Sequence, residues 1–371
     1  MGAKVIKNQS FISVSINIYT FAISMIKSDS EQFSQKDIQP VKELLSSKKN
    51  IVITTHHKPD GDAMGSSLGL FHYLKLKGHN CTVITPNEYP DFLSWLPGNK
   101  EVINFEKHKD QSLQKMKEAE ILFCLDFNRP DRTLDMEKEI NNSSAVKILI
   151  DHHLDPSDFA DYSFCYHTSA ATAELIYKFI VALGDKKLLN KEISECLYTG
   201  IMTDTGSFRF SSVTANIHRI IADLIDAGAV NYMIHERVYD DSTEQRLRLL
   251  GFCIKDKMEV LYEYNTAIIA LSNEDLKKYS HKDGDTEGIV NFPLSIRNII
   301  LSAFFTETDG IVKISLRSQG EFSAKEIVKE HFNGGGHRNA AGGKSETSLV
   351  DAVKKFKEIL PQYQKELLSI I

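Results

Sequence analysis

The sequence predicts an α/β protein with a mainly parallel N-terminal sheet that has helices on both faces, and a smaller C-terminal α/β domain across a cleft. Short apolar segments at residues 51–53, 81–85, 121–125 and 146–150 have the length and composition of buried parallel strands. A helical pattern at residues 63–78 follows the first of them. The length of 371 residues suits two domains rather than one core.

Further elements follow in order along the chain. Helices are expected at residues 37–45, 170–183, 191–203, 216–227, 231–239 and 242–257. In the C-terminal half, strands are expected at 266–271, 299–306 and 311–317, and a helix at 323–331. These elements divide the chain into an extension (1–34), an N-terminal domain (35–240), a helical linker (241–258) and a C-terminal domain (259–371).

Composition limits the class of partner. The chain is 42% hydrophobic and 25% charged, with a net charge of −6, as in a globular protein without membrane association. This charge excludes a strongly basic protein that coats nucleic acid, so no stable nucleic-acid complex is expected. A local basic groove remains compatible with a short substrate.

The number and spacing of the cysteines predict the cellular compartment of the protein. The chain has five, an odd number, and none forms a Cys-x-x-Cys pair. This pattern favours reduced thiols in a cytoplasmic protein over a disulfide framework or a structural zinc site.

Residues 11–26 form an apolar segment that follows Lys4 and Lys7 and resembles the hydrophobic region of a signal peptide. The segment contains several polar residues, is short for a membrane span and precedes no clear cleavage site. We favour an over-called start codon, with Met25 as the true first residue, over a leader peptide or a genuine extension of about 27 residues.

The segment after the first predicted strand is rich in metal ligands. His56, Asp60 and Asp62 lie within seven residues, on a loop that contains Pro59 and Gly61 and leads into a helix. Such a loop lies at the carboxyl edge of a sheet, where ligand sites of open α/β folds occur. Pro-Asp-Gly is also a common turn sequence, so an ordinary polar turn is the alternative.

Two later strands end in the same way. Asp126 follows residues 121–125, and Asp151, His152 and His153 close or follow the strand at 146–150. Asp204 follows the helix at 191–203. A single Asp or His at such a position is usually a cap or a structural residue. Their recurrence predicts that these side chains converge on one edge of one sheet.

Four carboxylates and two imidazoles suit two divalent ions with oxygen and nitrogen ligands. Because no thiolate is included, hard or borderline ions such as manganese or magnesium are expected over structural zinc. A pair of such ions can lower the pKa of a water and hold both the attacking and the leaving oxygen of a phosphoryl group. The reaction class is therefore phosphoester hydrolysis.

A glycine-rich segment marks the C-terminal domain. Gly334, Gly335, Gly336 and His337 precede Ala340-Ala341-Gly342-Gly343. Successive glycines allow the backbone to approach a ligand and expose amides to an anion, although a flexible connection has the same composition.

These motifs together resemble the DHH phosphoesterase family. The segment from His56 to Ser66, then Asp126, then residues 151–153 and then 204–206, look like its four successive motifs. Residues 334–343 resemble the signature of the DHH-associated C-terminal domain. The resemblance covers residues 35–360. Within the family, the two-domain layout is most similar to members that degrade short oligoribonucleotides and remove the 3′-phosphate of pAp.

The resemblance implies roles for individual residues. His56, Asp60 and Asp126 would hold one manganese, and Asp62, Asp126, His152 and Asp204 the second. The remaining roles fall to two groups: His153, Asp151 and His337 as catalytic or supporting residues, and Arg317, Ser318, Gly334, Gly335, Gly336 and His337 as substrate-binding residues. The substrate would be a short single-stranded RNA or a nucleotide, and a homodimer is an open alternative.

Three other functions remain as alternatives. One is a small-molecule phosphatase or phosphodiesterase for pAp, pApA or cyclic di-AMP. Family II inorganic pyrophosphatases share the first four motifs but would not be expected to carry the glycine signature. The third is a non-catalytic nucleotide-binding or scaffolding protein, which the presence of all six ligands disfavours.

Overall fold

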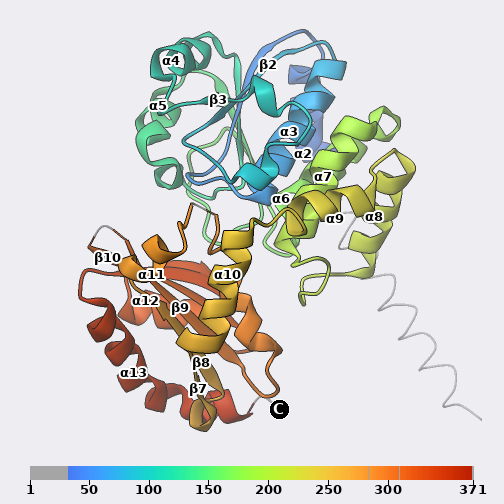
Figure 1. Cartoon of the computed structure of the whole chain (residues 1–371). Coiled ribbons are helices and arrows are strands. Elements are labelled where there is room, and N and C mark those ends of the chain that lie inside the picture. Colours follow the sequence, from blue (N-terminus) through green and yellow to red (C-terminus); the bar gives the residue numbers. More distant parts are fainter. Residues whose placement is uncertain (1–31, 283, 309, 370–371) are drawn as a thin grey trace, which may run out of the picture. The chain divides into compact units, whose positions relative to one another are not determined.

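The computed structural model describes residues 32–282, 284–308 and 310–369, which form two units (Figure 1). The N-terminal unit consists of the described residues up to Tyr89 together with Leu93–Ile234. The C-terminal unit consists of Pro90–Phe92 and the described residues from His235 onward. The apolar segment at residues 11–26 lies outside the described residues.

The N-terminal unit is built on a six-stranded parallel sheet of order β3-β2-β1-β4-β5-β6. The strands are β1 (Asn50–Thr54), β2 (Asn80–Thr85), β3 (Ile103–Asn104), β4 (Ile121–Leu125), β5 (Val146–Asp151) and β6 (Tyr162–Cys165). The four strands predicted from apolar segments are confirmed. The two edge strands, β3 and β6, were not predicted, because they are short and only partly buried.

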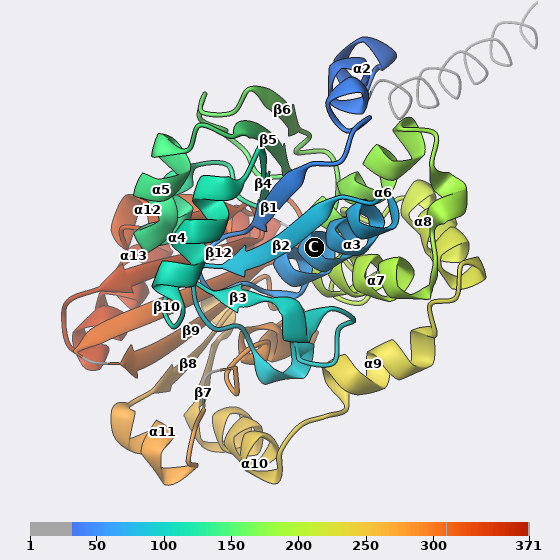
Figure 2. The same ribbon diagram turned by 90° about the horizontal axis from the view of Figure 1, so that it is seen from above.

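Helices cover both faces of this sheet, as predicted. Figures 1 and 2 show α4 and α5 on one face and α3, α6 and α7 on the other. The helices of the unit are α2 (Gln35–Leu44), α3 (Gly61–Leu76), α4 (Lys109–Glu118), α5 (Glu137–Asn142), α6 (Thr172–Ala182), α7 (Lys191–Asp204), α8 (Ala215–Asp226) and the start of α9 (Asn231–Tyr239). The boundary between the two units falls within α9, between Ile234 and His235. Alternate residues of the central strands, such as Val52 and Leu122, pack with Met116 of α4 and Ile140 of α5. Their burial fixes the sheet between two helical layers.

Helices α3 and α7 pack unusually closely. A Cβ atom at Gly65 would lie 2.5 Å from the carbonyl oxygen of Cys196 and 2.7 Å from the amide nitrogen of Gly200. A Cβ atom at Gly61 would meet Thr203, at the other end of the contact. The helices therefore run in opposite directions with their backbones in near contact, which brings the end of α7 beside the start of α3.

The C-terminal unit is built on a second six-stranded sheet, of order β11-β12-β10-β9-β8-β7. Its strands are β7 (Met258–Leu261), β8 (Thr266–Leu271), β9 (Leu301–Thr308), β10 (Ile311–Ser318), β11 (Gly335–His337) and β12 (Ala340–Ser345). All neighbours are antiparallel except β8 and β9. The glycine-rich segment expected as a loop is therefore a hairpin, because backbone pairing with β10 holds it in the sheet despite its poor strand propensity.

One face of the second sheet carries the main core of this unit. Ile314 and Leu316 of β10, with Phe305 of β9, pack against helices α12 (Ala324–His331) and α13 (Leu349–Ser369). The opposite face is covered over β8 and β9 by α10 (Glu244–Phe252), α11 (Asn273–Lys278) and the 3-10 helix Ile289–Ser295. Helix α13 was not predicted. The helix expected at 242–257 consists of α10 and a π-helical turn, Cys253–Lys257.

All five cysteines are free, and Cys124, Cys196 and Cys253 are buried. In the part of the chain that the structure describes, no helix reaches the length and apolar character needed to cross a membrane.

The contact between α3 and α7 predicts a sharp difference between two glycine substitutions. Gly65→Ala forces a methyl group against backbone atoms, so we expect a loss of about 1–3 kcal/mol in the free energy of unfolding. Gly251→Ala, in exposed α10, meets no atom within 4 Å. This control should leave stability unchanged or raise it by up to about 1 kcal/mol, because alanine favours helix. Equal unfolding midpoints in urea would contradict the close approach.

Candidate metal centre

The first candidate ligands lie where β1 passes into α3. His56 follows the strand, and Asp60 is the N-cap of α3, accepting hydrogen bonds from the amides of Asp62 and Ala63, each at 3.0 Å. Asp60 thus has the capping role of an ordinary turn residue. The same turn also places His56 Nε2 3.9 Å from Asp60 Oδ1, so capping and ligand roles are compatible.

Asp126 occupies the centre of the site. It follows β4 with a backbone φ of 62°, a left-handed conformation that aspartate tolerates better than most residues. Its Oδ2 lies 3.5 Å from His56 Nε2, and its Oδ1 lies 3.5 Å from His152 Nε2. The two oxygens of one carboxylate therefore face two different groups of ligands.

The second group forms around His152, which follows β5. Its Nε2 lies 3.4 Å from Asp204 Oδ2, at the end of α7, and 3.9 Å from Asp62 Oδ2, in the first turn of α3. Two of the sets of donors that are close enough to share an ion are made only of these residues. One is His56, Asp60 and Asp126, and the other is Asp62, His152 and Asp204. The six residues predicted as ligands all lie at this edge of the first sheet.

Backbone carbonyls set the orientation of both imidazoles. His56 Nδ1 lies 3.0 Å from the carbonyl oxygen of His57, and His152 Nδ1 lies 3.3 Å from that of Ser169. A carbonyl oxygen can only accept, so each Nδ1 carries the proton. In the neutral ring, Nε2 then has a free electron pair that points toward the carboxylates, as in histidines that bind metals.

The start of α6 holds two of the carboxylates, a feature that we did not predict from the sequence. The amides of Thr172 and Ala173 donate to Asp62 Oδ2 and Oδ1 at 2.6 and 2.8 Å. The Thr172 hydroxyl donates to Asp126 Oδ1 at 2.8 Å. The N-terminus of a helix favours negative charge, so α6 offsets part of the repulsion between these carboxylates. The only sequence signal was the run of small residues at the helix start.

A buried glutamate supports the loop before α6. Glu174, which is 3% exposed, accepts a hydrogen bond from the amide of Ala170 at 2.8 Å and forms an ion pair with Lys178. This contact holds the chain next to Ser169, whose carbonyl orients His152. Glu174 therefore helps to orient His152 indirectly, because it holds the backbone beside the Ser169 carbonyl.

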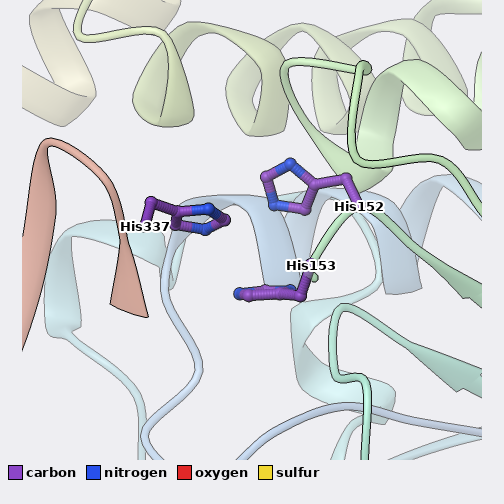
Figure 3. Close-up of side chains that lie close together, drawn as sticks. All are labelled: His152, His153 and His337. Carbon is purple, nitrogen blue, oxygen red and sulfur yellow. The ribbon is translucent and has the colours of Figure 1, made fainter. Parts of the chain in front are cut away.

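Asp151 and His153 form a separate pair. Asp151 is fully buried, and its Oδ1 lies 2.7 Å from His153 Nδ1. Figure 3 shows the inclined rings of His152 and His153 on the loop after β5, with centroids 4.8 Å apart at an interplanar angle of 70°. Because Asp151 engages Nδ1, the ring of His153 is fixed with Nε2 directed away from that carboxylate.

The crowded charges shift several pKa values. Burial, then the charges of Asp126 and Asp204, raise the pKa of Asp62 well above its ordinary value. Partial burial and the charge of Asp60, opposed by His152, raise the pKa of Asp204 to about 6. Burial alone would lower the pKa of His56, but hydrogen bonding with Asp126 and Asp60 raises it to about 10. These shifts reflect the negative potential that the crowded carboxylates create, and such a potential attracts cations.

The residues predicted to bind substrate lie in the C-terminal unit. Arg317 is on β10, and Gly335, Gly336 and His337 form β11, which is paired with β12; Figure 3 also labels His337. Gly334 precedes this strand, and a Cβ atom there would lie 2.1 Å from the carbonyl oxygen of Gly342. Ser318 is 7% exposed and donates to the carbonyl of Phe322, so its hydroxyl has an internal partner.

Two family models match this chain. The chain matches the DHH family, N-terminal domain, over residues 50–201 and the DHHA1 domain over residues 263–366. A bifunctional oligoribonuclease and PAP phosphatase NrnA of Thermus thermophilus is 29% identical, with 85% of this chain and 90% of the relative covered. A cyclic-di-AMP phosphodiesterase PdeA of Listeria monocytogenes is 25% identical over 88% of this chain but only 50% of its own length.

A solved structure is also similar along most of the chain. An exopolyphosphatase-related protein from Bacteroides fragilis is 40% identical, with a TM-score of 0.87, and the match covers 90% of this chain and 98% of that one. The fold and site together define an α/β protein with two adjoining sets of carboxylate and imidazole side chains that could hold metal ions. The chain belongs to the DHH family, in the group whose members also carry a DHHA1 domain.

The hydrogen bond from Thr172 to Asp126 predicts a role in metal binding. Thr172→Val removes the hydroxyl but keeps the amide that binds Asp62, so we expect manganese affinity to fall roughly 10- to 100-fold, as for other supporting residues. Calorimetric titration of the metal-free protein measures this affinity directly. Thr172→Ser keeps the hydroxyl and should bind as the native protein does. Equal affinity of the valine and native proteins would exclude this role.

The raised pKa values predict that metal binding releases protons. With a pKa of about 10, His56 is protonated at neutral pH and must lose a proton before Nε2 can bind a cation. Asp204 also carries a proton below its pKa of about 6. Manganese affinity should therefore rise with pH between these two values. Titrations in buffers of different protonation enthalpy count the released protons, and His56→Gln should release fewer. An affinity independent of pH would refute this linkage.

Proposed function

We propose that this protein is a metal-dependent phosphoester hydrolase that degrades short oligoribonucleotides to mononucleotides and removes the 3′-phosphate of pAp. The observation that carries the proposal is the position of Asp126, whose two oxygens face separate sets of ligands at equal distances of 3.5 Å. A single bridging carboxylate between two cations is the arrangement that phosphoryl chemistry uses.

The donor set fits two divalent cations. In this proposal His56, Asp60 and Asp126 hold one cation, and Asp62, Asp126, His152 and Asp204 hold the other. Manganese is the preferred ion and magnesium the alternative, because the set combines four carboxylates with two imidazoles and no thiolate. When bound, two such ions would lower the pKa of a water and neutralise charge on the phosphoryl group.

The remaining groups bind and orient the substrate. Asp151 fixes the ring of His153 through Nδ1, and in this proposal Nε2 of the same ring would contact a phosphate oxygen of the substrate. In the C-terminal unit, Arg317, His337 and the backbone of Gly334, Gly335 and Gly336 would bind a phosphate of the nucleotide. Ser318, which bonds to Phe322 and accepts from Asn339, would keep this region in shape.

Relatives support this substrate over the main alternative. The NrnA protein of Thermus thermophilus matches along 90% of its length, as expected for a protein of the same layout. The cyclic-di-AMP phosphodiesterase PdeA matches along 50% of its length, so half of that protein has no counterpart in the match. Cyclic di-AMP or a linear dinucleotide is therefore the second candidate substrate. The five free cysteines support a cytoplasmic location.

The test is manganese-dependent release of mononucleotides from RNA of two to five nucleotides, beside pAp, pyrophosphate and cyclic di-AMP. We expect hydrolysis of both the RNA and pAp, and its loss on chelation of the metal. Asp126→Ala should abolish nearly all turnover and retain the fold, because it removes the shared ligand together with one of several repelling charges. Activity on cyclic di-AMP or pAp alone would replace the proposed function, and an active Asp126→Ala would exclude the two-cation site.

A further inference from the structure

The chain directly after Asp204 has an unusual backbone conformation. Gly206, Ser207 and Phe208 have φ values of 56°, 59° and 63°, so three successive residues lie in the left-handed region. Glycine enters this region readily, whereas serine and phenylalanine do so at a steric cost. The turn therefore stores strain beside a candidate metal ligand, and strain of this kind is typical of functional segments.

A buried threonine holds the turn in this conformation. Thr205 is fully buried, and its hydroxyl accepts a hydrogen bond from the amide of Phe208 at 3.2 Å. The carbonyl oxygen of Thr205 accepts from the amides of Arg209 and Phe210 at 3.0 and 3.1 Å. These bonds fold the chain back, so Phe210 returns to the end of α7 that carries Asp204.

The ring of Phe210 packs on this turn and is still exposed. A Cβ atom on Gly206 would overlap the outer carbon atoms of the ring, so the ring edge rests on the glycine. Phe210 is 44% exposed, and no other aromatic ring in the described part of the chain stacks on it. Phe208, by contrast, packs with Tyr198 and His218. The Phe210 ring is therefore held in place and remains accessible to a ligand.

Phe210 lies close to the candidate metal centre. Gly206 follows Asp204 by two residues, so their Cα atoms are at most about 7.6 Å apart. Asp204 Oδ2 in turn lies 3.4 Å from His152 Nε2, within the second set of candidate ligands. In a nucleotide, one ribose separates a phosphate from its base. A phosphate at this set of ligands can therefore place its base against Phe210.

A cationic side chain accompanies the ring. Arg209 is exposed, and its Nε donates to the carbonyl oxygen of Gly206 at 2.7 Å. A positive charge therefore lies at the same turn as the ring that rests on Gly206. Proteins that bind single-stranded nucleic acid combine cationic groups with aromatic rings on which bases stack. The composition of the turn thus favours a nucleotide over an apolar ligand.

We propose that Phe210 is a stacking platform for a nucleobase of the substrate, beside the Asp204 end of the metal centre. The inference rests on the proposed function, in which a phosphate of the same nucleotide lies at the cations. Stacking accepts every base, because each base has a π-face. The platform therefore suits an enzyme that degrades short RNA of any sequence.

The test separates recognition of the base from recognition of the phosphate. Phe210→Leu keeps an apolar side chain but lacks an aromatic face, and Phe210→His keeps a planar ring that is mainly neutral at about pH 8.5. Tyr262→Leu is the matched control, because it removes an aromatic residue that is 67% exposed in the other unit. Each full-length protein is assayed with manganese on pAp, on a trinucleotide RNA and on the pAp analogue in which hydrogen replaces adenine.

Phe210→Leu should lose roughly 5- to 150-fold in kcat/KM on pAp, mainly through KM, because loss of a ring that stacks on a base weakens binding by about this factor. On the base-free analogue its kcat/KM should equal that of the native protein. Phe210→His should recover part of the loss, and Tyr262→Leu should match the native protein on every substrate. Manganese affinity, measured by calorimetric titration, should be equal in all four proteins, since no candidate metal ligand changes.

Several outcomes would exclude the platform. An equal loss on pAp and on the base-free analogue would mean that Phe210 only supports the turn. A native KM for pAp in Phe210→Leu, no recovery in Phe210→His, or the same loss in Tyr262→Leu would also exclude it. In each case the proposed function stands, provided that the native protein hydrolyses pAp and RNA. If the native protein hydrolyses neither, the proposed function fails and this inference fails with it.

Discussion

Mutual repulsion among four carboxylates at one sheet edge is the constraint that the N-terminal unit has to satisfy. Asp126 is almost fully buried beside Asp62, and both face Asp204, so bulk water screens these charges poorly. The structure compensates with amides of α6, the Thr172 hydroxyl and two imidazoles held by carbonyls. A cation bound at such a site would reduce this repulsion, so metal binding would raise folding stability.

Close helix packing makes this compensation geometrically feasible. Asp204 reaches the site because α7 ends beside the start of α3, and that approach requires glycine at positions 65 and 200. A Cβ atom on Gly200 would lie 2.9 Å from Asp62 Oδ1, so the same small residue leaves room for the Asp62 carboxylate. Packing in this unit is therefore inseparable from the placement of its charged side chains.

The two sheets contribute in different ways. In the parallel sheet, side chains act from the loops at the carboxyl ends of the strands, which is the usual location in open α/β folds. In the antiparallel sheet, small residues such as Gly335 and Gly342 lie opposite each other on β11 and β12 and leave the backbone exposed. The first arrangement gathers polar side chains at one sheet edge, whereas the second exposes the surface of the sheet itself.

The sequence by itself determined the four central strands, the α/β class with helices on both faces of the parallel sheet, and the six residues proposed as metal ligands. The strands are encoded locally by short apolar segments, and an acid or a histidine follows three of them closely. Helices α4 and α5, which form one of the two helical layers, were not predicted. Sequence reasoning missed the edge strands β3 and β6, which are too short for a burial pattern, and the β11–β12 hairpin, whose glycines have low strand propensity. It also missed α13, despite an amphipathic pattern that was there to be found.

Only the tertiary structure decided how the ligands are used. Thr172 binds a carboxylate 46 positions away, and its amide binds another 110 positions away, so no local pattern reports either contact. The same holds for the two directions of Asp126 and for the pairing of Lys313 with Lys344 across two strands. Composition and spacing select the residues of a site, whereas helix packing and strand register decide which atoms meet.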